Sequence, residues 1–154
     1  MARNRLTVNF DGFEALFEKL DRLGADMKDI TEEALRKSFD EVTPGIRQAM
    51  QRHHDTGDTE RSLTTQCRIE WDGSKASVPV GFKISDGGLP SIFLMYGTPR
   101  HPVSNQYGRT GAEADGVEED RRLYNSIYGS ATKRKVKQVQ EEVFQRHLRE
   151  VEGR

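Results

Sequence analysis

The sequence predicts an α+β fold: a small antiparallel sheet with a central β-hairpin, covered by N-terminal helices and a long C-terminal helix. Residues 62–85 alternate apolar and polar side chains on both sides of an Asp-Gly pair, which is typical of a hairpin. Residues 13–50 and 136–151 instead repeat apolar side chains every three or four positions, which is typical of helices. The chain has 154 residues, the length of one domain, and we expect a single domain over 1–154.

The N-terminal end of the chain is predicted to form a strand and a helix. Leu6, Val8 and Phe10 alternate with polar residues, which predicts a short strand. The apolar series over 13–23 predicts a helix that ends near Gly24, because glycine readily adopts the left-handed conformation that closes many helices.

A second helix is predicted over 29–50. Asp29 with Glu32 three residues later resembles a capping box, which places the start of the helix there. Pro44 lacks a backbone donor and clashes with the preceding turn, so it predicts either a kink or the junction of two helices.

The register of the hairpin follows from its turn. A two-residue loop of Asp72 and Gly73 makes Trp71 face Ser74, and the apolar residues of both strands then share one face. The expected cross-strand pairs are Ile69 with Ala76, Cys67 with Val78, Thr65 with Val80, and Leu63 with Phe82. Cys67, the single cysteine, is therefore expected to be a buried structural thiol, and no internal disulfide is possible.

The second half of the chain has a less regular pattern. Residues 91–96 form a short apolar run that fits a strand or a helix equally well. Residues 99–120 are rich in glycine, proline and acids, so they predict a long polar loop that is functional or disordered in isolation. A terminal helix is predicted from 136–151, with a similar spacing from Leu123 onward and a weak point at Gly129.

The charge distribution bears on the partners. The net charge is −1, but segments 1–60, 61–120 and 121–154 carry −4, −2 and +5. Complementary contacts between copies of the chain are therefore favoured over binding of free nucleic acid. No apolar run approaches the roughly 20 residues of a membrane span, so no membrane partner is expected.

Patterns that indicate chemistry are weak. His53, His54 and Asp55 end a helix, where neighbouring side chains point about 100° apart and rarely share a metal ion. Gly87 and Gly88 are not followed by the lysine of a phosphate-binding loop. We therefore expect no enzyme, no metal site and no cofactor.

Two basic segments have alternative interpretations. The first is interpreted as a solvated helix face, with an acidic neighbouring subunit or nucleic-acid phosphates as the alternatives. It consists of Lys133, Arg134, Lys135 and Lys137. The second mixes basic residues with aromatic residues. This composition suits a protein interface better than the stacking of nucleobases from a single strand. It consists of Arg121, Arg122, Tyr124 and Tyr128.

Three short motifs, in this order around the hairpin, resemble the head–tail joining or tail-completion proteins of long-tailed bacteriophages. The first is Gly12-Phe13-Glu14 with Leu16 and Leu20. The second is Thr56-Gly57 followed by Ser62-Leu63, with Thr59 where the family usually has leucine. The third is Met95-Tyr96-Gly97-Thr98, with Met95 where the family usually has an acidic residue.

The resemblance implies a virion structural protein without catalysis, assembled in the cytoplasm of the host bacterium. It implies a ring, commonly six-fold, at the head-proximal end of the tail, in contact with neighbouring neck and tail proteins and with DNA where DNA passes through the ring. The expected interface residues are Thr56, Gly57, Arg61, Tyr96, Gly97, Thr98, Arg100, His101, Arg121, Arg122, Tyr124 and Tyr128. The long loop is expected to contact a neighbouring subunit or the adjoining ring.

Three alternatives stay open. In the first, the protein is another ring of the same neck, either the tail terminator or the head-side stopper. In the second, it is a nucleic-acid-binding module that uses the basic terminal helix. In the third, it is a small hydrolase that uses His53, His54 or Cys67.

Overall fold

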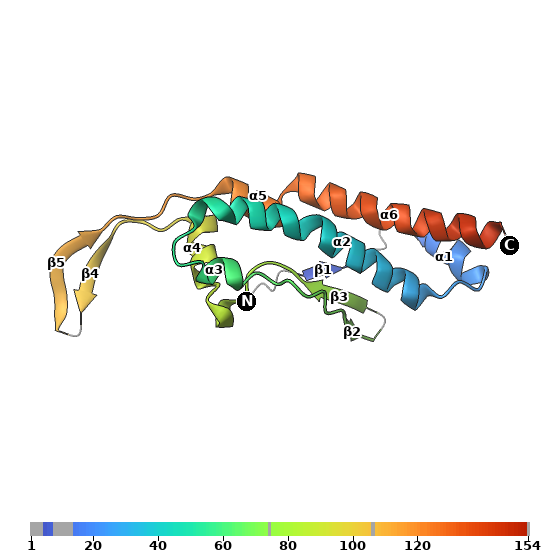
Figure 1. Ribbon diagram of the computed structural model, residues 1–154, viewed down its shortest axis with the longest axis horizontal. Coiled ribbons are helices and arrows are strands. Elements are labelled where there is room, and N and C mark those ends of the chain that lie inside the picture. The colour runs from blue at the N-terminus through green and yellow to red at the C-terminus, as the bar shows by residue number, and fades with distance from the viewer. Residues whose placement is uncertain (1–4, 8–13, 74, 106, 154) are drawn as a thin grey trace.

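The computed structural model describes residues 5–7, 14–73, 75–105 and 107–153 (Figure 1). Two long helices and several short helices accompany a three-stranded and a two-stranded antiparallel sheet. In chain order the elements are β1 (Arg5–Thr7), α1 (Glu14–Arg22), α2 (Met27–Met50), the 3-10 turn η1 (Gln51–His53), α3 (Asp58–Arg61), β2 (Glu70–Asp72), β3 (Lys75–Pro79), the 3-10 turn η2 (Ile84–Asp86), α4 (Leu89–Tyr96), β4 (His101–Asn105), β5 (Gly108–Ala114), α5 (Arg121–Tyr128) and α6 (Ser130–Glu152).

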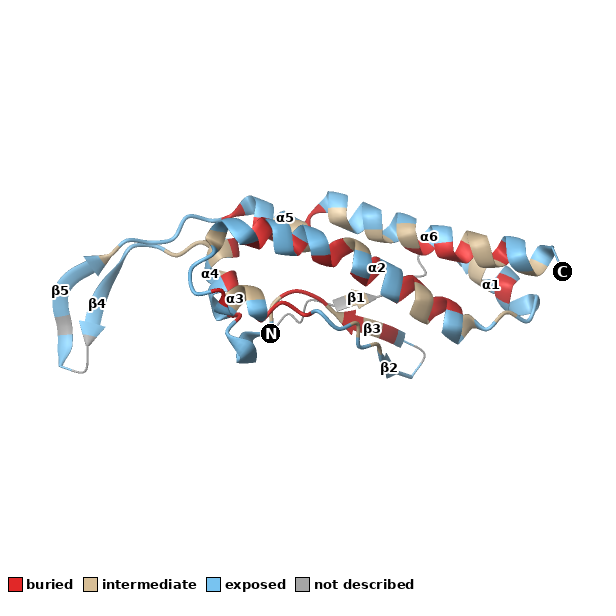
Figure 2. Cartoon of the chain, viewed as in Figure 1, coloured by how far each residue is buried: buried red, intermediate tan, exposed pale blue. Residues whose placement is uncertain are grey.

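The body has three layers, with α2 in the middle. Helices α2 and α6 run antiparallel along the length of the molecule, and the three-stranded sheet lies on the other side of α2 (Figure 1). One face of α2 packs against α1 and α6 through Ile30 and Ala34. The neighbouring face packs against the sheet through Leu35 and Phe39. The buried residues are concentrated along these contacts (Figure 2), and the predicted α+β class is confirmed.

The three-stranded sheet has the order β1-β3-β2, and the predicted hairpin is β2 with β3. Its predicted register is wrong by two residues at the turn, because Trp71 lies opposite Ala76 rather than Ser74. Gly73, with φ 59°, lies in the turn between the paired residues Asp72 and Lys75. The strand before the turn is also shorter than predicted, since β2 covers only Glu70–Asp72.

The predicted apolar face of the hairpin is confirmed in part, because Thr65 and Trp71, which were expected on it, are exposed. Leu63 lies opposite Phe82 in an isolated bridge, as expected. Cys67 is half-buried rather than buried, in the cluster that contains Val78 under α2, and this burial raises the pKa of its thiol. Leu6 lies opposite Val78, so the N-terminal strand joins this sheet. The predicted strand positions Val8 and Phe10 lie outside the described residues.

The helix ends differ from the prediction at one place. The carboxylate of Asp26 caps α2, because Asp26 Oδ1 accepts from the backbone nitrogens of Lys28 and Asp29 at 3.0 and 3.2 Å. The predicted cap at Asp29 is therefore three residues too late. Helix α2 then continues through Pro44 without interruption, so the predicted junction of two helices is wrong.

The structure also settles the ends of the other helices and the conformation of the ambiguous apolar run. Gly24 follows α1 with φ 72°, as predicted for a C-terminal glycine. The apolar run near 91–96 is helical, as part of α4. Gly129 is extended and separates α5 from α6, which confirms the predicted weak point.

Residues 99–120 do not form the predicted loop. Strands β4 and β5 pair as a second hairpin, which projects from one end of the body (Figure 1). Between residues 99 and 119, each side chain that the structure describes is exposed except the half-buried Ala114. We name residues 98–117 the arm.

The acidic and basic ends of the sequence meet within one chain. Glu33 and Glu41 of α2 form ion pairs with Arg146 and Lys135 of α6. Part of the charge complementarity that was expected between copies is therefore satisfied inside the molecule. Lys135 belongs to the basic cluster of the terminal helix, so this cluster is partly neutralised.

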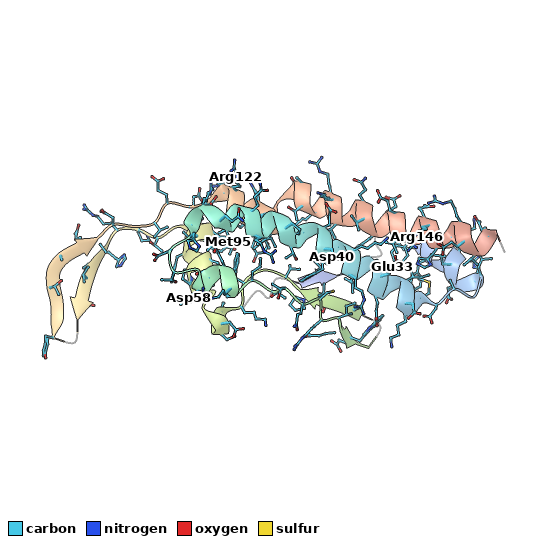
Figure 3. All side chains as sticks on the ribbon, viewed as in Figure 1. Glu33, Asp40, Asp58, Met95, Arg122 and Arg146 are labelled. Carbon is cyan, nitrogen blue, oxygen red and sulfur yellow. The ribbon has the colours of Figure 1, made fainter. Side chains whose placement is uncertain are left out.

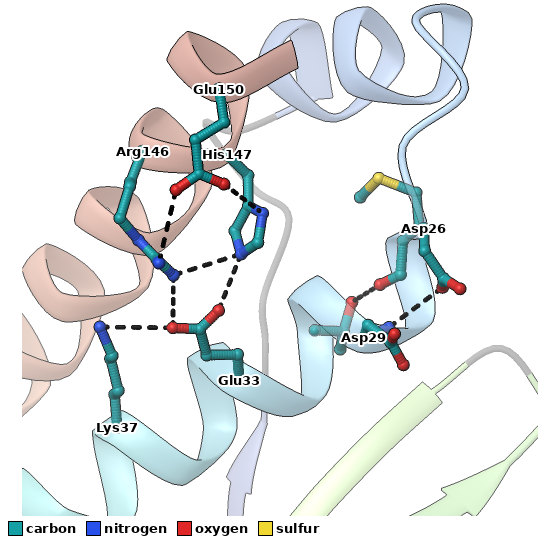
Figure 4. Close-up of polar contacts among 9 residues, drawn as sticks. Asp26, Asp29, Glu33, Lys37, Arg146, His147 and Glu150 are labelled. Carbon is teal, nitrogen blue, oxygen red and sulfur yellow. Dashed lines mark hydrogen bonds and ion pairs between the residues drawn. The ribbon is translucent and has the colours of Figure 1, made fainter.

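Glu33 is the centre of the main polar contact between α2 and α6 (Figure 4). His147 Nε2 lies 2.7 Å from Glu33 Oε2, and Lys37 Nζ lies 3.3 Å from Glu33 Oε1, which also pairs with Arg146. Burial raises the pKa of Glu33, but hydrogen bonds from His147, Arg146 and Lys37 outweigh burial and lower this pKa to about 2. Glu150 contacts Arg146 and His147 from the other side.

We expect Glu33→Ala to lower the free energy of unfolding by about 1–2 kcal/mol at neutral pH, since the site is partly exposed. The folded pKa is below the unfolded one, so this contribution is complete above about pH 4.5 and is lost as the pH falls toward 2. Urea denaturation of both proteins from pH 7 to 3 measures the difference. Glu18→Ala, at an exposed pair with Arg22, is the control and should change stability by less than about 0.5 kcal/mol. A pH-independent difference would contradict the ionic origin.

Candidate protein interface at the arm end

The base of the arm is fixed by a short two-residue bridge. Thr98 N donates to Val117 O at 2.8 Å, and Val117 N donates to Thr98 O at 3.0 Å. Gly97 precedes this bridge with φ 70°, and a Cβ at this position would lie 2.8 Å from Val117 O. A Cβ at Gly116 would lie 2.0 Å from Thr98 O. The two glycines therefore allow the two chain segments to approach closely where the arm leaves the body.

The arm carries few apolar groups, and those that the structure describes are exposed except for the half-buried Ala114. Tyr107 is 88% exposed and Val103 is 37% exposed. Arg100 pairs across the two strands with Glu113 at 3.4 Å and Asp115 at 3.1 Å. The pairing register of β4 with β5 shifts between Pro102 and Ser104. The arm is thus held by its own ladder and by surface ion pairs.

Helix α4 has one buried and one exposed apolar side. Met95 is 5% exposed and packs in a cluster with Met50 and Leu123, between α4, α2 and α5 (Figure 3). This packing explains why a methionine suits the position where the resembling family has an acid. Leu89 and Phe93, one helical turn apart, are 46% and 45% exposed. An exposed apolar stripe of this kind on a helix marks a candidate contact surface.

A cleft of about 530 Å³ lies between α4 and the segment that joins α2 to α3. Its apolar lining includes Met50, Pro90, Phe93, Leu94 and Val117. Its polar lining comes from residues 53–60. Val117 belongs to the arm, so the cleft opens directly beside the arm base.

The Thr-Gly motif forms the tight turn before α3. Gly57 has φ 81°, and a Cβ there would lie 3.1 Å from Arg61 Nη1 and 3.3 Å from His54 Cε1. Thr56 Oγ1 donates to Asp58 Oδ2 at 2.7 Å, and Arg61 pairs with Asp58. These hydrogen bonds, with the ion pair, lower the pKa of Asp58. The motif therefore shapes the wall of the cleft.

Three aromatic rings form a second feature of this end. Tyr96 and Tyr124 meet edge to face with ring centroids 5.7 Å apart, and Tyr124 and Tyr128 follow at 5.0 Å. Tyr96 is 59% exposed, whereas Tyr124 and Tyr128 are half-buried against α2 and α4. The rings thus pack largely inside this chain, and Tyr96 is the one most available to a partner.

The other predicted interface residues lie around the arm base. Arg121 Nε donates to Glu119 Oε1 at 2.9 Å, and Arg122 is exposed beside it (Figure 3). His101 starts β4, and its Nδ1 lies 3.2 Å from the carbonyl oxygen of Pro99. The structure therefore brings the predicted residues to one end of the molecule, although α3 and α5 present them on different sides.

Asp120 is the structural residue that the sequence did not reveal. Its side chain is 3% exposed, caps α5 by accepting from Arg122 N and Leu123 N, and contacts Arg52 and His53 at the end of α2. Burial raises the pKa of Asp120, but the hydrogen bonds from His53, Arg52 and the two backbone amides outweigh burial and hold this pKa below its ordinary value. The only sequence signal was an acid immediately before a helix.

Comparisons with known proteins found no match, whether to family models, to curated proteins or to solved structures. No helix in the described part of the chain is both long enough and apolar enough to cross a membrane. Among the described residues, no group of three or more His, Cys, Asp and Glu side chains is arranged to hold a metal ion.

Proposed function

We propose that this chain is a non-enzymatic structural protein of a bacteriophage virion. In this proposal it forms a ring, six-fold by the resemblance, at the head-proximal end of the tail and joins the tail to the connector of the head. Its partners are further copies of itself and the neighbouring neck and tail proteins, and it is assembled in the cytoplasm of the host bacterium.

One observation carries the proposal: a two-stranded arm leaves the body beside an exposed apolar helix stripe and a cleft. An arm that is exposed on both faces gains little for the fold of its own chain, and such segments are common in assembly contacts. The order of the three short sequence motifs selects the neck of a phage among the assemblies that use such arms.

The test is electron microscopy of particles from a phage in which this gene is disabled. We expect DNA-filled heads beside unattached tails of normal length. Tails of abnormal length would instead indicate the tail terminator, and heads that have lost their DNA would indicate the head-side stopper. Intact virions would contradict all three neck assignments.

A further inference from the structure

We propose that the tip of the arm, which comprises the described residues 103–105 and 107–111, docks into the cleft of a second copy of the chain, with Tyr107 as its leading side chain. The contact would join the arm of one copy to the α4 end of the next. This contact would hold neighbouring subunits of the proposed ring together. The inference rests on the proposed function only for the closure of the subunits into a ring.

The cleft has the size and lining of a receptor for an aromatic side chain. Its volume of about 530 Å³ exceeds the volume of one tyrosine side chain, and Phe93, Leu94 and Pro90 form an apolar wall. Aromatic residues that fill such pockets contribute most of the binding energy of many protein interfaces. A single tip residue can therefore carry much of this contact.

The charges of the cleft rim and of the tip are complementary. The rim carries the carboxylates of Asp55, Asp58 and Glu60. Asp58 pairs with Arg61, and Glu60 Oε2 lies 2.7 Å from His54 Nδ1. The sequence of the tip contains one basic residue, Arg109, and no acid. Complementary charge of this kind orients the partners and speeds their encounter.

The arm cannot fill its own cleft without losing its own pairing. Val117 lines the cleft and is bridged to Thr98, so the arm begins at the edge of the cleft. From there the arm projects away from the body (Figure 1). A strand of five residues such as β4 places the tip roughly 15 Å beyond this base. The occupant of the cleft is therefore a second copy of the chain.

A tip and a cleft are different surfaces, so each copy offers one of each. Contacts of this head-to-tail type close into a ring or continue as an open filament, according to the rotation between copies. The same property makes the contact testable with purified protein, independently of any phage.

The experiment uses two variants that are each defective in one surface. Tyr107→Ala removes the tip side chain, and Phe93→Arg replaces a 45% exposed cleft residue by one that repels the basic tip. Leu23→Arg, at a 43% exposed apolar residue at the other end of the body, is the matched control. Circular dichroism confirms that each variant is folded.

In sedimentation velocity we expect the wild type and Leu23→Arg to associate with rising concentration. Each of the other two variants alone should associate at least about tenfold more weakly. Their equimolar mixture should form a dimer and nothing larger, because the mixture offers only one intact pair of tip and cleft. Where the wild type sediments as an oligomer, a mixture that stays monomeric, or a Phe93→Arg protein that associates like the wild type, would overturn the proposal.

A second measurement covers an association too weak to sediment. A benzophenone amino acid at position 107 of the full chain is irradiated, and the crosslinks are mapped by mass spectrometry. Crosslinks to residues 53–60 or 87–94 of another copy support the contact. Crosslinks elsewhere, or none at about 1 mM protein, refute it, whatever the phage experiment shows about the neck.

Discussion

Replacement of residues 101–114 by a short Gly-Ser linker should leave the body folded and abolish the joining of heads to tails. The described side chains removed are exposed except for the half-buried Ala114, and β4 and β5 pair with each other. The linker keeps the bridge between Thr98 and Val117, so the cleft and α4 retain their support. We expect the free energy of unfolding to change by less than about 1 kcal/mol, since surface changes of this kind have small effects.

The functional readout is the yield of complete virions when the variant gene complements the disabled phage. We expect this yield to fall to that of the disabled gene, because the arm carries the proposed contact between copies. Ala112→Ser, an exposed substitution on β5, is the control and should complement fully. Normal virions from the linker variant would show that the arm has no part in joining. A variant that unfolds would show that the arm supports the body.

The fold class could be predicted because the core imposes a periodic pattern. Ile30 and Ala34 face one side of α2 and Leu35 and Phe39 the neighbouring side, and this spacing is visible in the sequence. The register of the hairpin could not be predicted from the same kind of pattern. A shift of two residues keeps every side chain on its face, so alternation alone cannot distinguish the two registers.

The second hairpin, formed by β4 and β5, could not be predicted because it lacks the periodic apolar pattern that a core imposes. Both faces of β4 and β5 are exposed, so no apolar alternation marks them in the sequence. Glycine at 108 and 111, both with positive φ, also suggested a loop rather than a strand. A segment without a core of its own therefore gives no periodic signal.

The polar contacts of Asp120 could not be predicted, because its partners lie far from it along the chain. Asp120 meets Arg52 and His53, which are 68 and 67 residues away. The sequence pattern indicates only a polar helix end at His53 and gives no role to Asp120. Contacts between residues so far apart have no local pattern, and only the packing of α5 against α2 creates this one.

Asp120 should be the most sensitive single position at this end. Its carboxylate caps α5, pairs with Arg52 and His53, and its backbone nitrogen donates to Leu94 O at 2.7 Å. We expect Asp120→Ala to lower the free energy of unfolding by about 2–4 kcal/mol, because a helix cap and the ion pair of a buried carboxylate with the half-exposed Arg52 are lost together. Urea denaturation followed by circular dichroism measures the loss.

Asp120→Asn separates the cap from the charge. Asparagine caps a helix as well as aspartate, so this variant should lose only the ionic part, about half of the total. Glu119→Gln, at the neighbouring exposed pair with Arg121, should change stability by less than about 0.5 kcal/mol. An asparagine variant as stable as the wild type would show that the contacts with Arg52 and His53 contribute nothing.

The pH dependence of the free energy of unfolding also separates the ionic contribution of Asp120 from its helix cap, without a further substitution. The folded pKa of Asp120 is below its unfolded value near 3.8, so its ionic contribution is complete above about pH 4 and is lost as the pH falls through the folded value. The stability difference between the wild type and Asp120→Asn should therefore shrink as the pH falls below about 4. Asp120 joins the end of the arm to α2 and α4. If Asp120→Ala lowers the yield of virions and Asp120→Asn restores it, the position of the arm, and not its presence alone, governs the joining of heads to tails.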